Sequence, residues 1–186
     1  RESEVWDVAS AGCFGKEGQE YPGALEVLKA IFSYDYLWVN VRVTGGAYGC
    51  MCNFSRNGYG FFTSYRDPNL SATLDVYKKA ADYVRNFEAG KRDMTKYIIG
   101  TISGIDQPLE PSALGERSFH AYQSGITVEM IQKERNQVLD ATEETIRSLA
   151  DYIESMMDAG TVCAIGNDRK LEEEKEMFKQ VCSLNQ

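Results

Sequence analysis

A hairpin signal at Asn57-Gly58 constrains the fold of this chain more than any other feature of the sequence. Both residues tolerate the positive φ angles of a tight turn, and the dipeptide is the strongest short-range indication of a β-hairpin. From Ala47 onward the residues alternate with a period of two, as in a half-buried strand. Two sets of side chains are therefore predicted on opposite faces: Tyr48, Cys50, Cys52 and Phe54 on one, and Met51, Asn53 and Ser55 on the other.

A two-residue turn at this position sets the register of the hairpin. The predicted pairs are Phe54 with Phe61, Cys52 with Thr63, and Cys50 with Tyr65. This register places four aromatic side chains on one face of the sheet: Tyr48, Phe54, Phe61 and Tyr65.

Before the hairpin, the sequence predicts a strand over residues 3–9 and a helix that begins near Pro22, because proline suits the first turn of a helix. The apolar stretch from Tyr34 to Val43 is compatible with either helix or strand, and its pattern does not decide between them.

After the hairpin, Asp67 is expected to cap a long helix that starts at Pro68 and ends before Gly90. Helices are then predicted over residues 93–104, 112–122 and 127–138. The apolar faces of the predicted helices, read at helical spacing, contain Leu25, Leu28, Ile31, Phe32, Leu70, Leu74, Tyr77, Ala81, Val84, Ile146, Leu149, Ile153 and Met156.

The last third of the chain completes the predicted order. Asp140 with Glu143 resembles a capping box and starts a helix that Gly160 stops. A short buried strand over residues 161–165 follows, and then a terminal helix that is capped by Asp168 and has Leu171, Phe178 and Val181 facing inward. This order predicts an α+β fold, a two-layer sandwich in which helices cover one face of a single mixed or antiparallel sheet. The 186 residues suit one domain, 1–186, with one sizeable core.

Charge and composition exclude several classes of partner. The formal net charge of −8 repels phosphate backbones, so we expect no nucleic-acid partner. No apolar run reaches the roughly 18 residues of a membrane span, so we expect no membrane partner. The five cysteines lack the spacing of a disulfide framework, which favours reduced thiols and a reducing compartment. For Cys50 and Cys52, packing is favoured over metal binding.

The chain contains one histidine, His120. A zinc site built on two or three imidazoles cannot form in this chain alone. No nucleophile motif lies near His120, so a histidine on a helix surface is the favoured interpretation. We therefore expect no catalytic residue and no metal site within the chain.

The segment from Arg42 to Gly49 concentrates the residues best suited to a binding site. Gly45 and Gly46 let the backbone turn sharply or lie close to a ligand. Arg42 and Tyr48, on either side of this bend, can converge on one carbonyl or carboxylate. The competing interpretation is an ordinary turn, with Arg42 on the surface and Tyr48 stacked in the sheet, and the pattern alone favours it.

Three strings in order resemble the pitrilysin/insulinase superfamily of zinc metallopeptidases: Arg42 to Gly49, Ser64-Tyr65-Arg66-Asp67-Pro68-Asn69, and Ile99 to Asp106. Asp35-Tyr36-Leu37-Trp38 fits the presequence-protease branch. The resemblance covers nearly the whole chain and matches the last of four related domains in the long chains of that branch.

The resemblance implies a clamshell peptidase that degrades peptides in a closed chamber. Its N-terminal half carries zinc on an HxxEH motif, and its C-terminal half supplies an Arg and a Tyr to the substrate backbone. Those two positions match Arg42 and Tyr48, while Thr44 stands where relatives often have a basic residue. The implied partners are the N-terminal domains of the same parent chain and a peptide substrate, and the implied location is the cytoplasm or an organelle matrix.

The resemblance also implies that residues 35–42 are helical and that the chain alone hydrolyses nothing. Two other functions stay open. One is a non-catalytic structural or partner subunit of the same superfamily, and the other is a freestanding ligand-binding domain. An HxxEH motif upstream of this chain would distinguish the peptidase from the non-catalytic relative.

Overall fold

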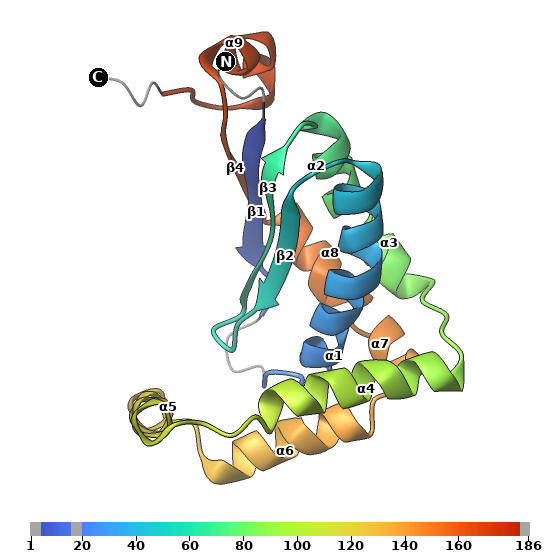
Figure 1. The fold of residues 1–186 in the computed structure, drawn as a ribbon, viewed down its shortest axis with the longest axis vertical. Helices are drawn as coiled ribbons and strands as arrows, with labels where there is room; N and C mark the ends of the chain where they lie inside the picture. Colours follow the sequence, from blue (N-terminus) through green and yellow to red (C-terminus); the bar gives the residue numbers. More distant parts are fainter. Residues whose placement is uncertain (1–4, 16–19, 183–186) are drawn as a thin grey trace.

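Four antiparallel strands form one sheet in the order β2-β3-β1-β4 (Figure 1). The computed structural model describes residues 5–15 and 20–182. The strands are β1 (Trp6–Cys13), β2 (Gly49–Phe54), β3 (Tyr59–Asp67) and β4 (Thr161–Ile165). The first strand continues to Cys13, beyond its predicted end, and the first two residues of its predicted range, Ser3 and Glu4, lie outside the described residues.

Helices make up most of the remaining chain and confirm the α+β prediction. They are α1 (Ala24–Ile31), the π-helical segments η1 (Phe32–Tyr36) and η2 (Trp38–Thr44), α2 (Ser71–Lys78), α3 (Ala80–Arg85), α4 (Lys91–Ile105), α5 (Pro111–Gln123), α6 (Val128–Leu139), α7 (Glu143–Arg147), α8 (Ala150–Asp158), α9 (Asp168–Glu173) and the 3-10 turn η3 (Lys175–Met177).

One face of the sheet is covered by helices. The continuous helix α1–η1–η2 runs along it, with α8 and α2 beside it (Figure 1). The thirteen apolar residues predicted at helical spacing from Leu25 to Met156 are all buried in this layer. The inward prediction for the terminal helix is wrong at Val181, which is 46% exposed, because α9 ends at Glu173. Phe62 of β3 meets Phe32 and Tyr77 at ring-centroid distances of 5.2 and 5.4 Å. Among the described residues, no helix lies over the other face of the sheet, which we call the open face.

The predicted hairpin register is wrong by one residue. Phe54 pairs with Gly60, Cys52 with Phe62 and Cys50 with Ser64. The turn contains three residues, because Ser55 bonds to Tyr59 across Arg56, Asn57 and Gly58. Only Gly58 of these has a positive φ, of 83°, whereas a two-residue turn of the expected type needs two such residues.

The shifted register changes which aromatic side chains share a face. Phe54 and Phe62 point into the core and are 3% and 0% exposed. Phe61 lies on the open face, as Tyr65 does, whereas Phe54 lies in the core. The predicted stack of four aromatic side chains therefore does not form. Successive side chains of a strand point to opposite faces of the sheet. A slip of one residue in the register therefore moves every side chain of that strand to the opposite face.

Several helix ends differ from their predictions. The helix expected from Pro68 begins at Ser71, and Lys79 divides it into α2 and α3. Asn167 rather than Asp168 caps α9. The strand β4 has the predicted range, but as an edge strand it is mostly exposed rather than buried.

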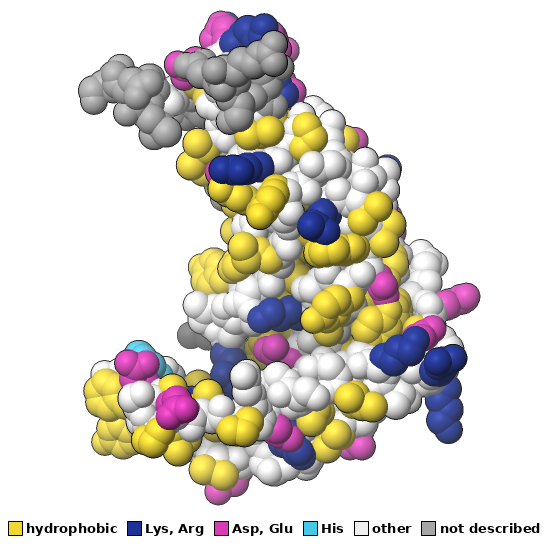
Figure 2. All heavy atoms as spheres, viewed as in Figure 1, with side chains coloured by type: hydrophobic (Ala, Val, Ile, Leu, Met, Phe, Trp, Pro, Cys, Tyr) yellow, Lys and Arg dark blue, Asp and Glu magenta, His cyan; other side chains and the backbone are white. Residues whose placement is uncertain are grey.

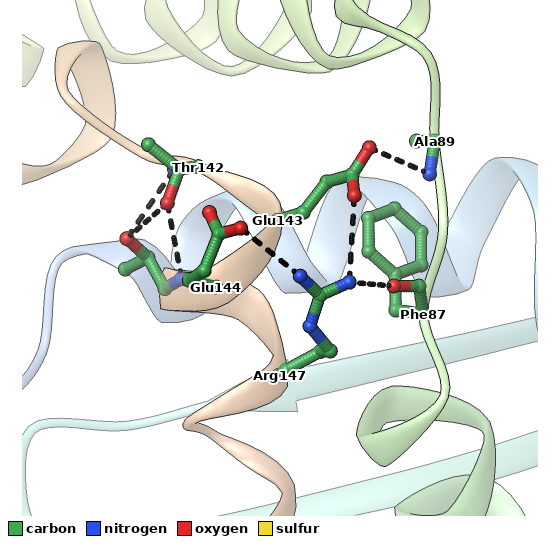
Figure 3. Close-up of polar contacts among 7 residues, drawn as sticks. Phe87, Ala89, Thr142, Glu143, Glu144 and Arg147 are labelled. Atoms are coloured by element: carbon green, nitrogen blue, oxygen red, sulfur yellow. Dashed lines mark hydrogen bonds and ion pairs between the residues drawn. The ribbon is translucent and has the colours of Figure 1, made fainter.

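The helix start predicted at Asp140 lies two residues further on, at Thr142, which forms a capping box with Thr145 (Figure 3). Near it, Arg147 bonds to the carbonyl oxygen of Phe87 at 2.7 Å and pairs with Glu143 and Glu144 at 3.4 and 3.1 Å (Figure 3). This cluster joins the segment after α3 to α7, so the guanidinium of Arg147 acts as a structural connector.

Helix α5 stands apart from the sheet and has no buried residue (Figure 1). Hydrophobic side chains gather on its surface, and His120 lies exposed beside them (Figure 2). Within residues 5–15 and 20–182, no helix is both long enough and apolar enough to cross a membrane.

Candidate functional site

The site begins where the long first helix changes its hydrogen-bond pattern. The stretch from Tyr34 to Val43, whose pattern fits either helix or strand, is helical, which confirms the helix that the resemblance implies for residues 35–42. The amide of Leu37 bonds to the carbonyl of Phe32 five residues earlier. Phe32, Leu37 and Val41 are fully buried and anchor this segment on the sheet. Wide turns of this kind are rare in proteins and occur frequently at functional sites.

Gly45 and Gly46 end this helix as a compact cap. The amides of Gly46 and Ala47 bond to the carbonyls of Arg42 and Val41 at 3.0 and 3.1 Å. Gly46 has a φ of +83°, a conformation in which a side chain is strained. A Cβ at Gly45 would lie 2.5 Å from the carbonyl oxygen of Val41. The glycine pair therefore lets the chain turn within two residues from helix η2 toward strand β2.

Arg42 is held on both sides of its guanidinium. The group lies over the ring of Trp38, 4.0 Å from the ring centroid, and its Nε donates to the carbonyl oxygen of Tyr48 at 3.0 Å. Among the described residues, no hydrogen bond engages its two terminal nitrogens. Arg42 is thus an oriented cation with donors still available for a ligand.

Tyr48 lies at the end of the open face. Its side chain is 67% exposed, and its ring meets that of Tyr65 edge-on at 5.8 Å. The predicted contact with Tyr65 is present, whereas Cys52, expected on the same face as Tyr48, is buried. The structure therefore brings Arg42 and Tyr48 together through the Tyr48 carbonyl and leaves the phenol exposed.

A second segment, residues 64–69, braces this loop. The side-chain amide of Asn69 donates to the carbonyl oxygen of Gly45 at 2.5 Å. Asp67 is fully buried. Its carboxylate accepts from the backbone amide of Asn69 at 2.9 Å and from the Thr73 hydroxyl at 2.6 Å. Asp67 was predicted to cap a helix, but it orients Asn69 against the glycine loop instead. The Asp-Pro-Asn string is a recognisable turn signal that could have indicated this role.

Arg66 is a further residue at the site, although the sequence before Pro68 favours a helix start at Arg66-Asp67 over a site. Its φ of 47° is the only positive value found at a non-glycine residue in the described part of the chain. A residue held in this region carries roughly 1–3 kcal/mol of strain, and such residues cluster at functional sites. Nothing in its sequence context signals the conformation, because it depends on how β3 meets β1.

The described residues do not fit a zinc ion. His120 is exposed on α5, and residues 5–15 and 20–182 contain no group of three or more potential ligands. Burial raises the pKa of Cys52 to about 12, and burial also raises the pKa of Cys50.

Comparison with known proteins identifies the family. A family model described as the PreP C-terminal domain matches residues 2–168. The chain belongs to this family. Protein HypA of Clostridium perfringens is 42% identical over 183 residues, which cover 98% of this chain and 19% of the relative. Presequence protease 1, chloroplastic/mitochondrial, of Arabidopsis thaliana is 36% identical over 166 residues, with 89% and 15% covered. The chain thus spans less than a fifth of the length of these curated relatives.

Solved structures share the fold of this chain at low sequence identity. The peptidase M16 inactive domain from Pseudomonas fluorescens has a TM-score of 0.64 at 13% identity, covering 88% of this chain and 41% of its own. Pitrilysin has a TM-score of 0.58 at 13% identity, with 86% and 18% covered. The predicted membership of the presequence-protease branch is therefore confirmed by the family model and the relatives, and the solved structures show the same fold.

Proposed function

We propose that this chain is the substrate-binding C-terminal domain of a zinc metalloendopeptidase that degrades peptides in a closed chamber. The chain would be the last of four related domains, and the zinc would belong to the N-terminal half of the parent. Reduced cysteines fit a reducing compartment, and one relative is named as chloroplastic and mitochondrial.

The orientation of Arg42 is the observation that carries the proposal. Stacking on Trp38 and the bond to the Tyr48 carbonyl hold its guanidinium in place without using its terminal nitrogens. The exposed phenol of Tyr48 provides a second donor on the other side of the glycine turn. Two donors fixed before the substrate arrives stabilise negative charge on a peptide carbonyl at no cost in reorganisation.

The test replaces these donors in the full-length protein. Arg42→Ala and Tyr48→Phe are each expected to lower kcat/KM by about 10²–10³, the range for loss of one fixed donor at a developing oxyanion. Bound zinc, measured by metal analysis, should stay unchanged, since neither residue would contact the metal.

Matched controls come from α5. Arg117→Ala and Tyr122→Phe change the same residue types at exposed positions and should leave turnover unaltered. Unaltered kinetics in both Arg42→Ala and Tyr48→Phe would refute the assigned role. An absent HxxEH motif in the parent chain would instead favour a non-catalytic subunit.

The isolated chain of 186 residues is expected to hydrolyse no peptide. Incubation with a quenched fluorescent peptide, with and without chelator, tests this expectation. Stoichiometric zinc together with chelator-sensitive hydrolysis would contradict it.

A further inference from the structure

Arg66 lies between the two exposed tyrosines of the site. Its guanidinium carbon is 5.9 Å from the ring centroid of Tyr48 and 5.4 Å from that of Tyr65. Both distances are within the reach of a cation–π contact, which holds a ring and a cation in a preferred relative orientation. The Tyr48 and Tyr65 rings also contact each other edge-on, so the three side chains form one cluster.

The backbone of Arg66 is tied to both neighbouring strands. Its amide donates to the Asp7 carboxylate of β1 at 2.8 Å. The amide of Tyr48 approaches the carbonyl oxygens of Tyr65 and Arg66 at 3.1 and 3.4 Å. These bonds hold Arg66 in its left-handed conformation at the point where the Tyr48 segment joins the sheet.

The charge of Arg66 is not used in an ion pair. Carboxylates pair with five other arginines: Arg56, Arg85, Arg135, Arg147 and Arg169. Among the described residues, no ion pair involves Arg66, and Asp7 accepts its backbone amide rather than its guanidinium. Glycine or asparagine would adopt the same φ with less strain. The guanidinium over the rings is therefore the property that distinguishes arginine at this position.

We infer that Arg66 is a positioning residue that orients the phenol of Tyr48 toward the substrate. The inference rests on the proposed function, since it assigns Arg66 a role only through Tyr48. Arg66→Asn removes the cation and keeps a residue that tolerates the left-handed region. Arg66→Gly does the same with no side chain, and Arg66→Lys retains a cation.

A double-mutant cycle in the full-length protein tests the inference. Arg66→Asn should lower kcat/KM by about two- to fivefold, the factor that corresponds to an exposed cation–π contact. The loss should fall mainly on kcat, because Tyr48 is proposed to act on the transition state. In the Tyr48→Phe background, Arg66→Asn should cause no further loss, and Arg66→Lys should retain part of the activity.

Stability separates positioning from packing. The melting temperatures of Arg66→Asn and Arg66→Gly should equal or exceed that of the unsubstituted protein, because the strain is relieved. Unchanged turnover of Arg66→Asn with a lower melting temperature would overturn the inference. A double variant whose loss in kcat/KM equals the product of the two single losses would also overturn it. If Tyr48→Phe leaves turnover unchanged, the inference fails together with the role of Tyr48, and the proposed function fails as well only if Arg42→Ala is also without effect. If Tyr48→Phe lowers turnover and Arg66→Asn does not, only the inference about Arg66 fails.

Discussion

The covered face and the open face of the sheet use alternate residues of the same strands for different purposes. On the covered face, Cys52, Phe54 and Phe62 are at most 4% exposed and pack against helices. On the open face, Met51 and Tyr65 are 59% and 44% exposed. The loop with Arg42 and Tyr48 lies at one end of the open face.

The difference shows how a short strand serves stability and binding at once. Alternation assigns every second side chain to the core, and the residues between remain available for a ligand. Substitutions on the two faces should therefore have separable consequences. Those on the covered face should change the free energy of unfolding, and those at the end of the open face should change turnover.

The largest expected effect distinguishes the neighbours Phe62 and Phe61. Phe62→Ala should lower the free energy of unfolding by about 3–5 kcal/mol, because it leaves a cavity beneath a fully buried ring. Phe61→Ala, on the open face, should cost less than about 1 kcal/mol, as expected outside the core. Denaturant unfolding of both variants measures the difference. A larger loss for Phe61→Ala than for Phe62→Ala would indicate the register of the two-residue turn and contradict the assignment of the two faces.

The next effect concerns the glycine loop. Gly46→Ala should cost about 1–2 kcal/mol, the penalty for an L-residue at a positive φ. Gly125→Ala is the matched control, because Gly125 has a φ of 66° in an exposed turn with open space around it. Both variants should unfold at similar denaturant concentrations, but only Gly46→Ala should lower turnover of the full-length protein. Equal turnover in both would remove the loop from the site.

The smallest effect is a pH dependence of the free energy of unfolding that comes from Cys52 on the covered face. Burial raises the pKa of Cys52 from 9.0 to about 12. The folded state therefore binds this proton more tightly than the unfolded state does. The resulting contribution of Cys52 to the free energy of unfolding is complete below about pH 9 and declines as the pH rises toward 12. Between pH 8 and 10 the loss should be about 1 kcal/mol.

Unfolding measured across this range in a Cys52→Ala variant should show a smaller decline than in the unsubstituted chain. A Cys163→Ala variant should keep the full decline, because Cys163 lies exposed on the open face. Identical slopes in all three proteins would show that Cys52 does not titrate as its burial implies.

Much of the fold was predictable because its signals are local. The spacing of Leu25, Leu28 and Ile31 predicts a buried helix face, and the turn at Gly58 predicts a hairpin. The register was not predictable from the dipeptide, since two- and three-residue turns share the same composition. The choice depends on whether Phe61 or Phe62 enters the core. Packing against helices outside the hairpin, through Phe32 and Tyr77, decides this.

For the site, the residues that can bind are evident in the sequence: an arginine, a glycine pair and a tyrosine lie within seven positions, in a string that resembles a known family. How these residues are held depends on contacts that form in the folded chain. Trp38 orients Arg42, Asn69 braces Gly45, and Arg66 reaches Tyr48 across the sheet. The contacts made by Asn69 and Arg66 join segments that are distant in the chain, and their geometry depends on packing rather than on local preference.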